Sequence, residues 1–192
     1  MLNYLSVSIM GVLSVSIMGV GLLLSSCSNN SSITADASPL AGSDFEQFDG
    51  WMNDSPALAA LTKEQAHSGK FSTVSGPGNE FSLGYNNQLQ NLSPEWPAKL
   101  TISAWLFVPD EKTTAKLVIE VKNSTANKPN LLWEDVNLAD KVRLLGKWQH
   151  VEHIITMPDD ARPDSRLLVY VWSANAQHPV YMDDLQIFSN GK

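Results

Sequence analysis

Six aromatic and polar residues stand at alternate positions of four strand-like runs, and together they have the chemistry of a sugar-binding face. Side chains alternate between the two faces of a strand, and these residues oppose the aliphatic positions of their runs. Indole and phenol rings can stack on the C–H faces of a pyranose, while carboxylate and imidazole groups can bond its hydroxyls. If the four runs line one sheet, they form a carbohydrate platform of Trp105, Tyr170, Trp172, Glu120, His150 and Glu152.

The alternative is that these rings are structural. Aromatic side chains supply much of the buried area of a core, so for any single Trp, including Trp105 and Trp172, a core position or cover by the terminal strands is favoured. Three further Trp residues lie in loop-like contexts, and loops at one end of the domain are the alternative place for a site: Trp51, Trp96 and Trp133.

The runs that must position these residues are short, rich in β-branched and aromatic residues, and bounded by Gly, Pro, Asn and Asp. This pattern predicts an all-β fold, an antiparallel β-sandwich or jelly roll. Helical signal is limited to one turn within 55–64 and another within 137–145. The expected strands are Phe45–Trp51, Gly69–Val74, Glu80–Tyr85, Leu100–Val108, Lys116–Lys122, Trp148–Ile155, Leu167–Trp172 and Val180–Phe188.

Catalytic chemistry is not indicated, and no catalytic residue is predicted. The four His residues have no spacing that suggests a metal trio, and phosphate-loop, dinucleotide and Gly-x-Ser-x-Gly patterns are absent from the sequence. A glycosidase needs only a pair of carboxylates, and the chain has 20 Asp and Glu. In a domain of this size we nevertheless expect a binding face rather than a catalytic cleft.

Length, charge and cysteine content narrow the class of protein further. The 192 residues suit one domain with extensions, and the net charge of −7 argues against nucleic acid as a partner. The single Cys excludes an internal disulfide.

That cysteine follows an apolar N-terminal run in which an eight-residue unit occurs twice, at 5–12 and 13–20. The segment Leu24-Ser25-Ser26-Cys27 resembles a bacterial lipobox. The resemblance implies a signal peptide at 1–26, a Cys27 that carries a diacylglycerol and palmitate-type chains, and a flexible tether at 27–43. Because Ser28, and not Asp, follows the cysteine, the resemblance also implies that the protein is anchored in the outer membrane. The alternative is a plain membrane-spanning anchor, since the first four residues lack Lys and Arg.

Five short segments beyond the tether, in this order, resemble the jelly-roll carbohydrate-binding modules with a galactose-binding-domain-like fold. The resemblance covers residues 44–188 and implies a domain at 44–192. Its segments are Phe45-Glu46 with Trp51, Ala66–Ser72, Ser103-Ala104-Trp105 with Val108-Pro109, Gly146-Lys147-Trp148, and Val180–Ile187.

The family often holds a structural calcium ion between its first strand, the Ser-Gly-Lys turn and its last strand. The matching positions are Glu46, the backbone around Lys70, and Asp183. Calcium takes six to eight oxygen ligands, so a site joining both chain ends is physically sensible. His67 replaces an acidic residue that the family often has near this turn, and Glu64 could substitute for it. The alternative is that these acids are simply solvated.

The sequence therefore predicts a membrane-tethered, non-catalytic lipoprotein that binds polysaccharide or another glycan. The alternative is a structural or assembly lipoprotein whose sandwich binds a protein partner.

Overall fold

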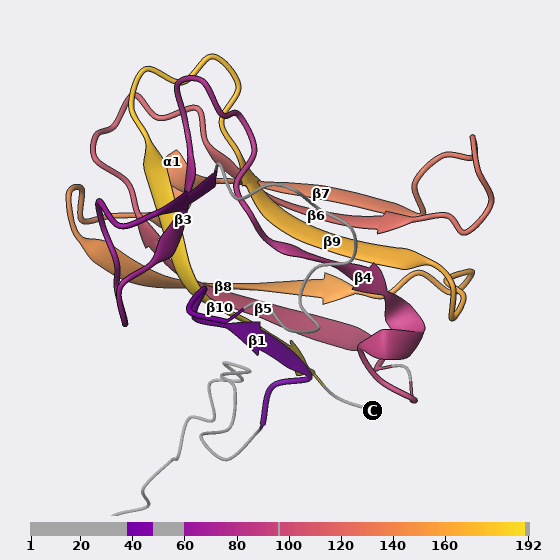
Figure 1. The fold of residues 1–192 in the computed structure, drawn as a ribbon. Coiled ribbons are helices and arrows are strands. Elements are labelled where there is room, and N and C mark those ends of the chain that lie inside the picture. Colours follow the sequence, from indigo (N-terminus) through magenta and orange to yellow (C-terminus); the bar gives the residue numbers. More distant parts are fainter. Residues whose placement is uncertain (1–37, 48–59, 96, 191–192) are drawn as a thin grey trace, which may run out of the picture. The chain divides into compact units, whose positions relative to one another are not determined.

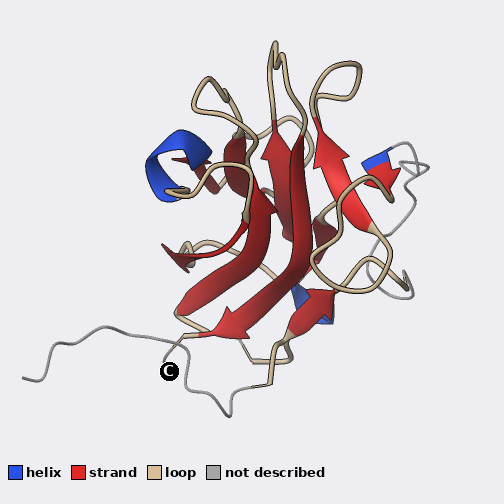
Figure 2. Cartoon of the chain, turned by 90° about the vertical axis from the view of Figure 1, so that its left-hand side faces the viewer, coloured by secondary structure: helices blue, strands red, loops and turns tan. Residues whose placement is uncertain are grey.

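The computed structural model describes residues 38–47, 60–95 and 97–190. All of them belong to the compact unit that begins at residue 33. Strands are its principal regular elements, and the helical turns are few and short (Figure 2). Among these residues no helix has the length and apolar character needed to cross a membrane. Cys27, Trp51 and Trp96 lie outside the described residues.

One layer is an antiparallel sheet of six strands in the order β2-β3-β10-β5-β8, with β1 also paired to β10 (Figure 1). Its two long central strands, β5 and β10, lie side by side although residues 108–179 separate them in the sequence. The strands are β1 (Ala41–Ser43), β2 (Leu61–Thr62), β3 (Ser72–Ser75), β5 (Lys99–Phe107), β8 (Trp148–Thr156) and β10 (Val180–Ser189).

The other layer is an antiparallel sheet of four strands in the order β4-β9-β6-β7. Two helical turns accompany it, the 3-10 turn Leu89–Asn91 after β4 and the helix α1 (Leu138–Lys141) after β7. The four strands are β4 (Tyr85–Gln88), β6 (Lys116–Lys122), β7 (Leu132–Asn137) and β9 (Arg166–Trp172).

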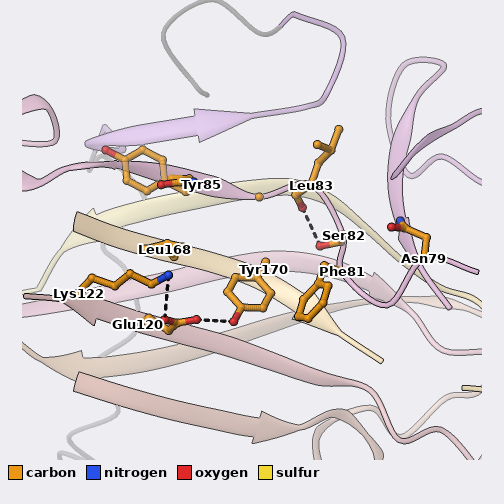
Figure 3. A pocket seen from close by; sticks show the side chains of 11 residues that line it. Asn79, Phe81, Ser82, Leu83, Tyr85, Glu120, Lys122, Leu168 and Tyr170 are labelled. Atoms are coloured by element: carbon orange, nitrogen blue, oxygen red, sulfur yellow. Dashed lines mark hydrogen bonds and ion pairs between the residues drawn. The ribbon is translucent and has the colours of Figure 1, made fainter. Parts of the chain in front are cut away.

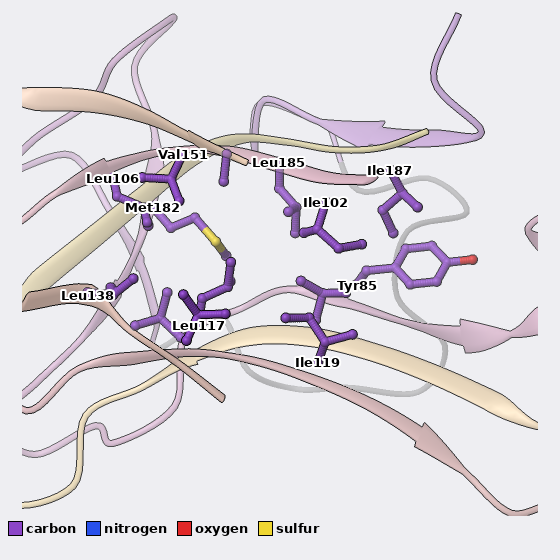
Figure 4. Close-up of a cluster of buried hydrophobic side chains, with 14 of the residues drawn as sticks. Tyr85, Ile102, Leu106, Leu117, Ile119, Leu138, Val151, Met182, Leu185 and Ile187 are labelled. Carbon is purple, nitrogen blue, oxygen red and sulfur yellow. The ribbon is translucent and has the colours of Figure 1, made fainter. Parts of the chain in front are cut away.

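The hydrophobic core fills the space between the two sheets (Figure 4). Inward positions alternate along each strand, as strand geometry requires. Leu106 of β5 and Met182 of β10 face Leu117 and Ile119 of β6, and all four side chains are fully buried. The outward positions of both sheets are thereby left free for polar and aromatic residues.

The predicted antiparallel sandwich is confirmed, with differences at several elements. The described part of Phe45–Trp51 is not a strand, whereas Ala41–Ser43, expected in the tether, pairs with β10 as β1. Strand β4 begins only at Tyr85, where the expected run ends. Strand β7 was not expected at all, and it carries a residue that matters for the site.

Candidate functional site

The six residues predicted to form one platform lie on two different sheets. Trp105, His150 and Glu152 belong to β5 and β8 of the six-stranded sheet, while Glu120 belongs to β6 of the four-stranded sheet. Tyr170 and Trp172, on β9, accompany Glu120. The expectation of a single platform is therefore wrong, because the two sets occupy the outer faces of opposite layers of the sandwich.

On the six-stranded sheet, the indole of Trp105 is already covered by a neighbour. The His67 imidazole stacks on it with ring centroids 3.8 Å apart and an interplanar angle of 13°. The His150 ring lies beside the same indole, with ring centroids 5.5 Å apart. Its Nε2 shares a 2.6 Å hydrogen bond with Ser103 Oγ. Because a sugar ring needs a free aromatic face, Trp105 is better suited to holding the loop of His67 than to stacking on a ligand.

A groove of about 420 Å³ crosses the outer face of the four-stranded sheet (Figure 3). It combines an exposed aromatic ring with polar groups contributed by three strands and the segment before β4. Its lining residues are Asn79, Phe81, Ser82, Leu83, Gly84, Tyr85, Asn86, Glu120, Lys122, Leu168 and Tyr170.

Glu120 is the polar centre of this groove, and only 4% of the residue is exposed. The Tyr170 hydroxyl donates to its Oε1, and the Asn130 amide donates to its Oε2 at 3.1 Å. Burial of Tyr170, and then its bond to Glu120, raise the pKa of the phenol, so the hydroxyl stays a donor at neutral pH. The pair is thus a fixed, preorganised polar element beside the open groove.

Phe81 supplies the exposed aromatic surface of the groove, with 53% of the residue accessible. Its ring is supported from behind, stacked parallel to Trp172 with centroids 6.4 Å apart and edge-on to Tyr170 at 5.9 Å. Trp172 itself is partly covered, and its indole N–H is buried without a hydrogen-bond partner among the described residues. Trp172 therefore acts as a support for Phe81. The sequence predicts Trp172 as a site residue but does not single out Phe81.

Trp133 is the second aromatic residue missing from the predicted platform. It was expected in a loop, but it lies on β7 directly opposite Glu120 of β6, and directly paired residues share a face. The residue is 49% exposed. It extends the aromatic surface of Phe81 and Tyr170 across the sheet, beyond the groove itself.

Two acidic residues predicted to hold a metal ion, Glu46 and Asp183, both accept hydrogen bonds from the loop 67–71. Glu46 Oε1 accepts two backbone N–H groups, those of Lys70 and Phe71, both at 2.6 Å. Gly69, with a φ of +56°, makes this approach possible, because a Cβ there would lie 2.5 Å from Glu46 Oε1. Asp183 Oδ2 accepts the N–H of His67 at 2.8 Å. We call Glu46, Asp183 and the loop 67–71 the carboxylate clamp.

A β-bulge in β10 aims two adjacent acids at this loop. The pairing of β10 with β5 shifts between Asp183 and Gln186, and Asp184 has a φ of +46°. Asp183 is fully buried and also accepts the N–H groups of Ser68 and Asp184. Asp184 bonds the His67 ring at 2.6 Å. The clamp thus ties both ends of the domain to the loop whose His67 covers Trp105.

The oxygen atoms of the carboxylate clamp can be compared with the ligands that a calcium ion needs. The clamp offers two carboxylates, whereas calcium takes six to eight oxygen ligands, and the oxygens of Asp183 already accept N–H groups. Among residues 38–47, 60–95 and 97–190, no three His, Cys, Asp or Glu side chains gather in a way that could hold a metal ion. Calcium therefore stays a prediction, and its remaining ligands would have to be carbonyls or water.

The clamp predicts a dependence of stability on acid pH. The N–H group of Lys70, followed by that of Phe71, lowers the pKa of Glu46 below its ordinary value of 4.5. A carboxylate with a lowered folded-state pKa stabilises the fold above its unfolded pKa, and this contribution is lost as the pH falls through the folded-state pKa. We expect the Tm of the wild type to fall more steeply below pH ~4.5 than that of Glu46→Gln, which keeps an acceptor oxygen without the titration.

Thermal melts of both proteins across this range, followed by circular dichroism, measure the difference. Burial acts in the opposite direction on Asp183 and raises its pKa, but Asp183 is present in both proteins. The difference between the curves therefore isolates Glu46. Parallel curves would show that the Glu46 carboxylate is not bound by the loop.

No family model matches the chain, and none of the curated proteins compared with it matches either. Solved structures do match. The CBM22-1 xylan-binding domain from Paenibacillus barcinonensis has a TM-score of 0.52 and 21% identity over 81% of this chain and 97% of that domain. The CBM22-2 xylan-binding domain from the same bacterium has a TM-score of 0.50 and 17% identity over 78% of this chain and 99% of that domain. At these identities the likeness concerns the fold, a β-sandwich.

Proposed function

We propose that this chain is a non-catalytic glycan-binding protein and that the glycan binds along the outer face of the four-stranded sheet. The observation that carries this proposal is the groove beside Phe81, in which an exposed ring adjoins the fixed Tyr170–Glu120 pair. Ring stacking and directed hydrogen bonds are the two interactions that a pyranose offers. The names of the similar structures, which are xylan-binding domains, support the same class of ligand.

The composition of the groove favours binding over hydrolysis. Glycoside hydrolysis uses two carboxylates that flank the scissile bond. Glu120 is the single acid among the described residues that line the groove, and both of its oxygens already accept hydrogen bonds. A ligand in the groove is therefore held without a second acid to attack it.

Affinity electrophoresis of the full chain in detergent, through gels that contain a panel of soluble polysaccharides, tests the proposal. We expect at least one polysaccharide to retard the protein and to change its Trp fluorescence. A dissociation constant in the micromolar to millimolar range is expected, because one or two stacked rings must offset ordering and desolvation. Retardation by none of them would contradict the proposal and favour the alternative, a structural lipoprotein that binds a protein partner.

We also propose that Cys27 anchors the chain by lipid to the outer membrane, as the lipobox resemblance suggests. Each buried CH₂ contributes roughly 0.8 kcal/mol, so several acyl chains hold a protein firmly. Anchoring would bring many weak glycan sites to one polymer and raise their joint avidity. Labelled palmitate should enter the wild type and not Cys27→Ser, and label in both would disprove lipidation at this residue.

A further inference from the structure

We infer that the groove selects glycans that carry negatively charged groups, uronate carboxylates or sulfates, because Lys122 and Arg166 stand side by side at its edge. The inference rests on the proposed function and specifies its ligand. Its starting point is a pair of adjacent cations that the protein itself balances only in part.

Lys122 of β6 and Arg166 of β9 are direct partners in the antiparallel register. Directly opposed residues share a face, here the outer face that also carries Glu120 and Leu168. Like charges in this position destabilise a sheet. A chain with a net charge of −7 has many acids that could offset two adjacent cations, so their placement here calls for a reason.

The neighbours of the two cations offer one carboxylate, that of Glu120, against two positive charges. Lys122 Nζ forms a long ion pair of 3.8 Å with Glu120 Oε2 (Figure 3), and the Lys122 side chain is 47% exposed. Arg166 Nη1 donates at 2.7 Å to Asn86 Oδ1, a neutral acceptor. Among the described residues no carboxylate lies within ion-pair distance of Arg166.

A third cation on the same sheet face shows the contrast. Lys116 of β6 pairs with Asp135 of β7 at 2.8 Å, so its charge is balanced locally. Lys116 does not line the groove, whereas Lys122 does. Two cations therefore share one acid, Glu120, at the end of the face where the groove lies, and the excess positive charge is that of Arg166.

An anionic sugar would complete this arrangement. A carboxylate or sulfate between Lys122 Nζ and the free guanidinium nitrogens of Arg166 would form charge-assisted hydrogen bonds and remove the repulsion between the cations. The same sugar ring, or its neighbour in the polymer, would lie against the aromatic side of the groove at Tyr170. A neutral sugar would leave Arg166 without an anionic partner.

The test compares soluble polysaccharides of similar length and different charge with the full chain in detergent, by affinity electrophoresis and calorimetry. The neutral arm is hydroxyethylcellulose and arabinoxylan, the uronate arm polygalacturonate and alginate, and the sulfate arm dextran sulfate. We expect one charged arm to bind at least about tenfold more tightly than the neutral arm, and this preference to shrink as added salt screens the charges.

Three variants assign the preference to the pair. Lys122→Gln and Arg166→Gln should each weaken binding to the charged arm by about fivefold, and Arg166→Gln, which lies outside the groove lining, should leave binding to neutral polymers unchanged within about twofold. Lys116→Gln, which removes a charge from the same face away from the groove, should change neither.

The outcomes separate the inference from the proposed function. Equal binding of neutral and charged polymers overturns the inference and leaves the proposed function standing, while binding of none overturns both. An equal loss in Lys116→Gln shows a diffuse charge effect and also overturns the inference. Preference for polygalacturonate or for dextran sulfate supports it and identifies the charged group.

Discussion

Replacing Trp133 by alanine is expected to weaken glycan binding at least about tenfold, or roughly 1.4 kcal/mol, with little change in Tm. The indole is half exposed on β7 and directly opposite Glu120, so it lies where a glycan leaving the groove would cross the sheet. An aromatic ring that a sugar covers contributes to binding, whereas an exposed ring contributes little to the folded state. Calorimetric titration with the polysaccharide that retards the protein measures the affinity, and thermal melting measures Tm.

Ile154→Ala is the matched control for this prediction. Ile154 is also an exposed apolar residue, 38% accessible, but it lies on β8 of the opposite sheet. Its replacement should leave glycan affinity unchanged. Trp105→Ala should act in the opposite way to Trp133→Ala, lowering Tm through loss of the His67 stack while the folded protein still binds. If Trp105→Ala abolishes binding and Trp133→Ala does not, the glycan binds to the six-stranded sheet.

The sequence predicts which side chains of a strand point outward, but it does not predict the sheet to which the strand belongs. Alternation placed Glu120 and Tyr170 outward, as they are, because each strand reveals its own inner face through its aliphatic residues. Whether β5 or β9 lies beside β6 depends on pairing between segments distant in the sequence, and periodicity carries no information about such pairing.

Strand β7 was missed for a local physical reason. Its inward positions are Leu132, Glu134 and Val136, and the charged residue in the middle breaks the alternation that indicates a strand. The structure accounts for Glu134, whose Oε2 lies 2.6 Å from Nε2 of His153 on β8. An ion-paired or hydrogen-bonded acid can thus occupy an inward position at the sandwich edge, and the exposed Trp133 beside it was mistaken for a loop residue.

Asp183→Ala is expected to destabilise the domain by about 3 kcal/mol, which for a domain of this size corresponds to a Tm lower by roughly 6–12 °C. The Asp183 carboxylate is fully buried and accepts the backbone N–H groups of His67, Ser68 and Asp184. Alanine would leave these donors without an acceptor, and an unpaired buried donor costs much more than a hydrogen bond gains. Chemical denaturation and thermal melting measure the loss.

Asp184→Ala provides the comparison, because it removes a neighbouring carboxylate from the same bulge. Asp184 is partly exposed and bonds the His67 ring and the Ser68 hydroxyl, groups that water can also satisfy. We expect it to cost about 1 kcal/mol, clearly less than Asp183→Ala. Equal losses in the two variants would show that the bulge conformation, and not the three N–H groups that Asp183 accepts, determines the stability.

The wild type and Asp183→Ala together also decide whether the carboxylate clamp binds calcium. If a calcium ion takes Asp183 as a ligand, millimolar Ca²⁺ should raise the Tm of the wild type by several degrees, a chelator should reverse the rise, and Asp183→Ala should respond to neither. If the N–H bonds are all that Asp183 contributes, the wild-type Tm is the same with calcium and with chelator, while Asp183→Ala still melts far lower. The first result establishes the predicted metal, and the second refutes it. In either case Asp183 connects the last strand to the loop that covers Trp105, on the sheet opposite the proposed glycan site.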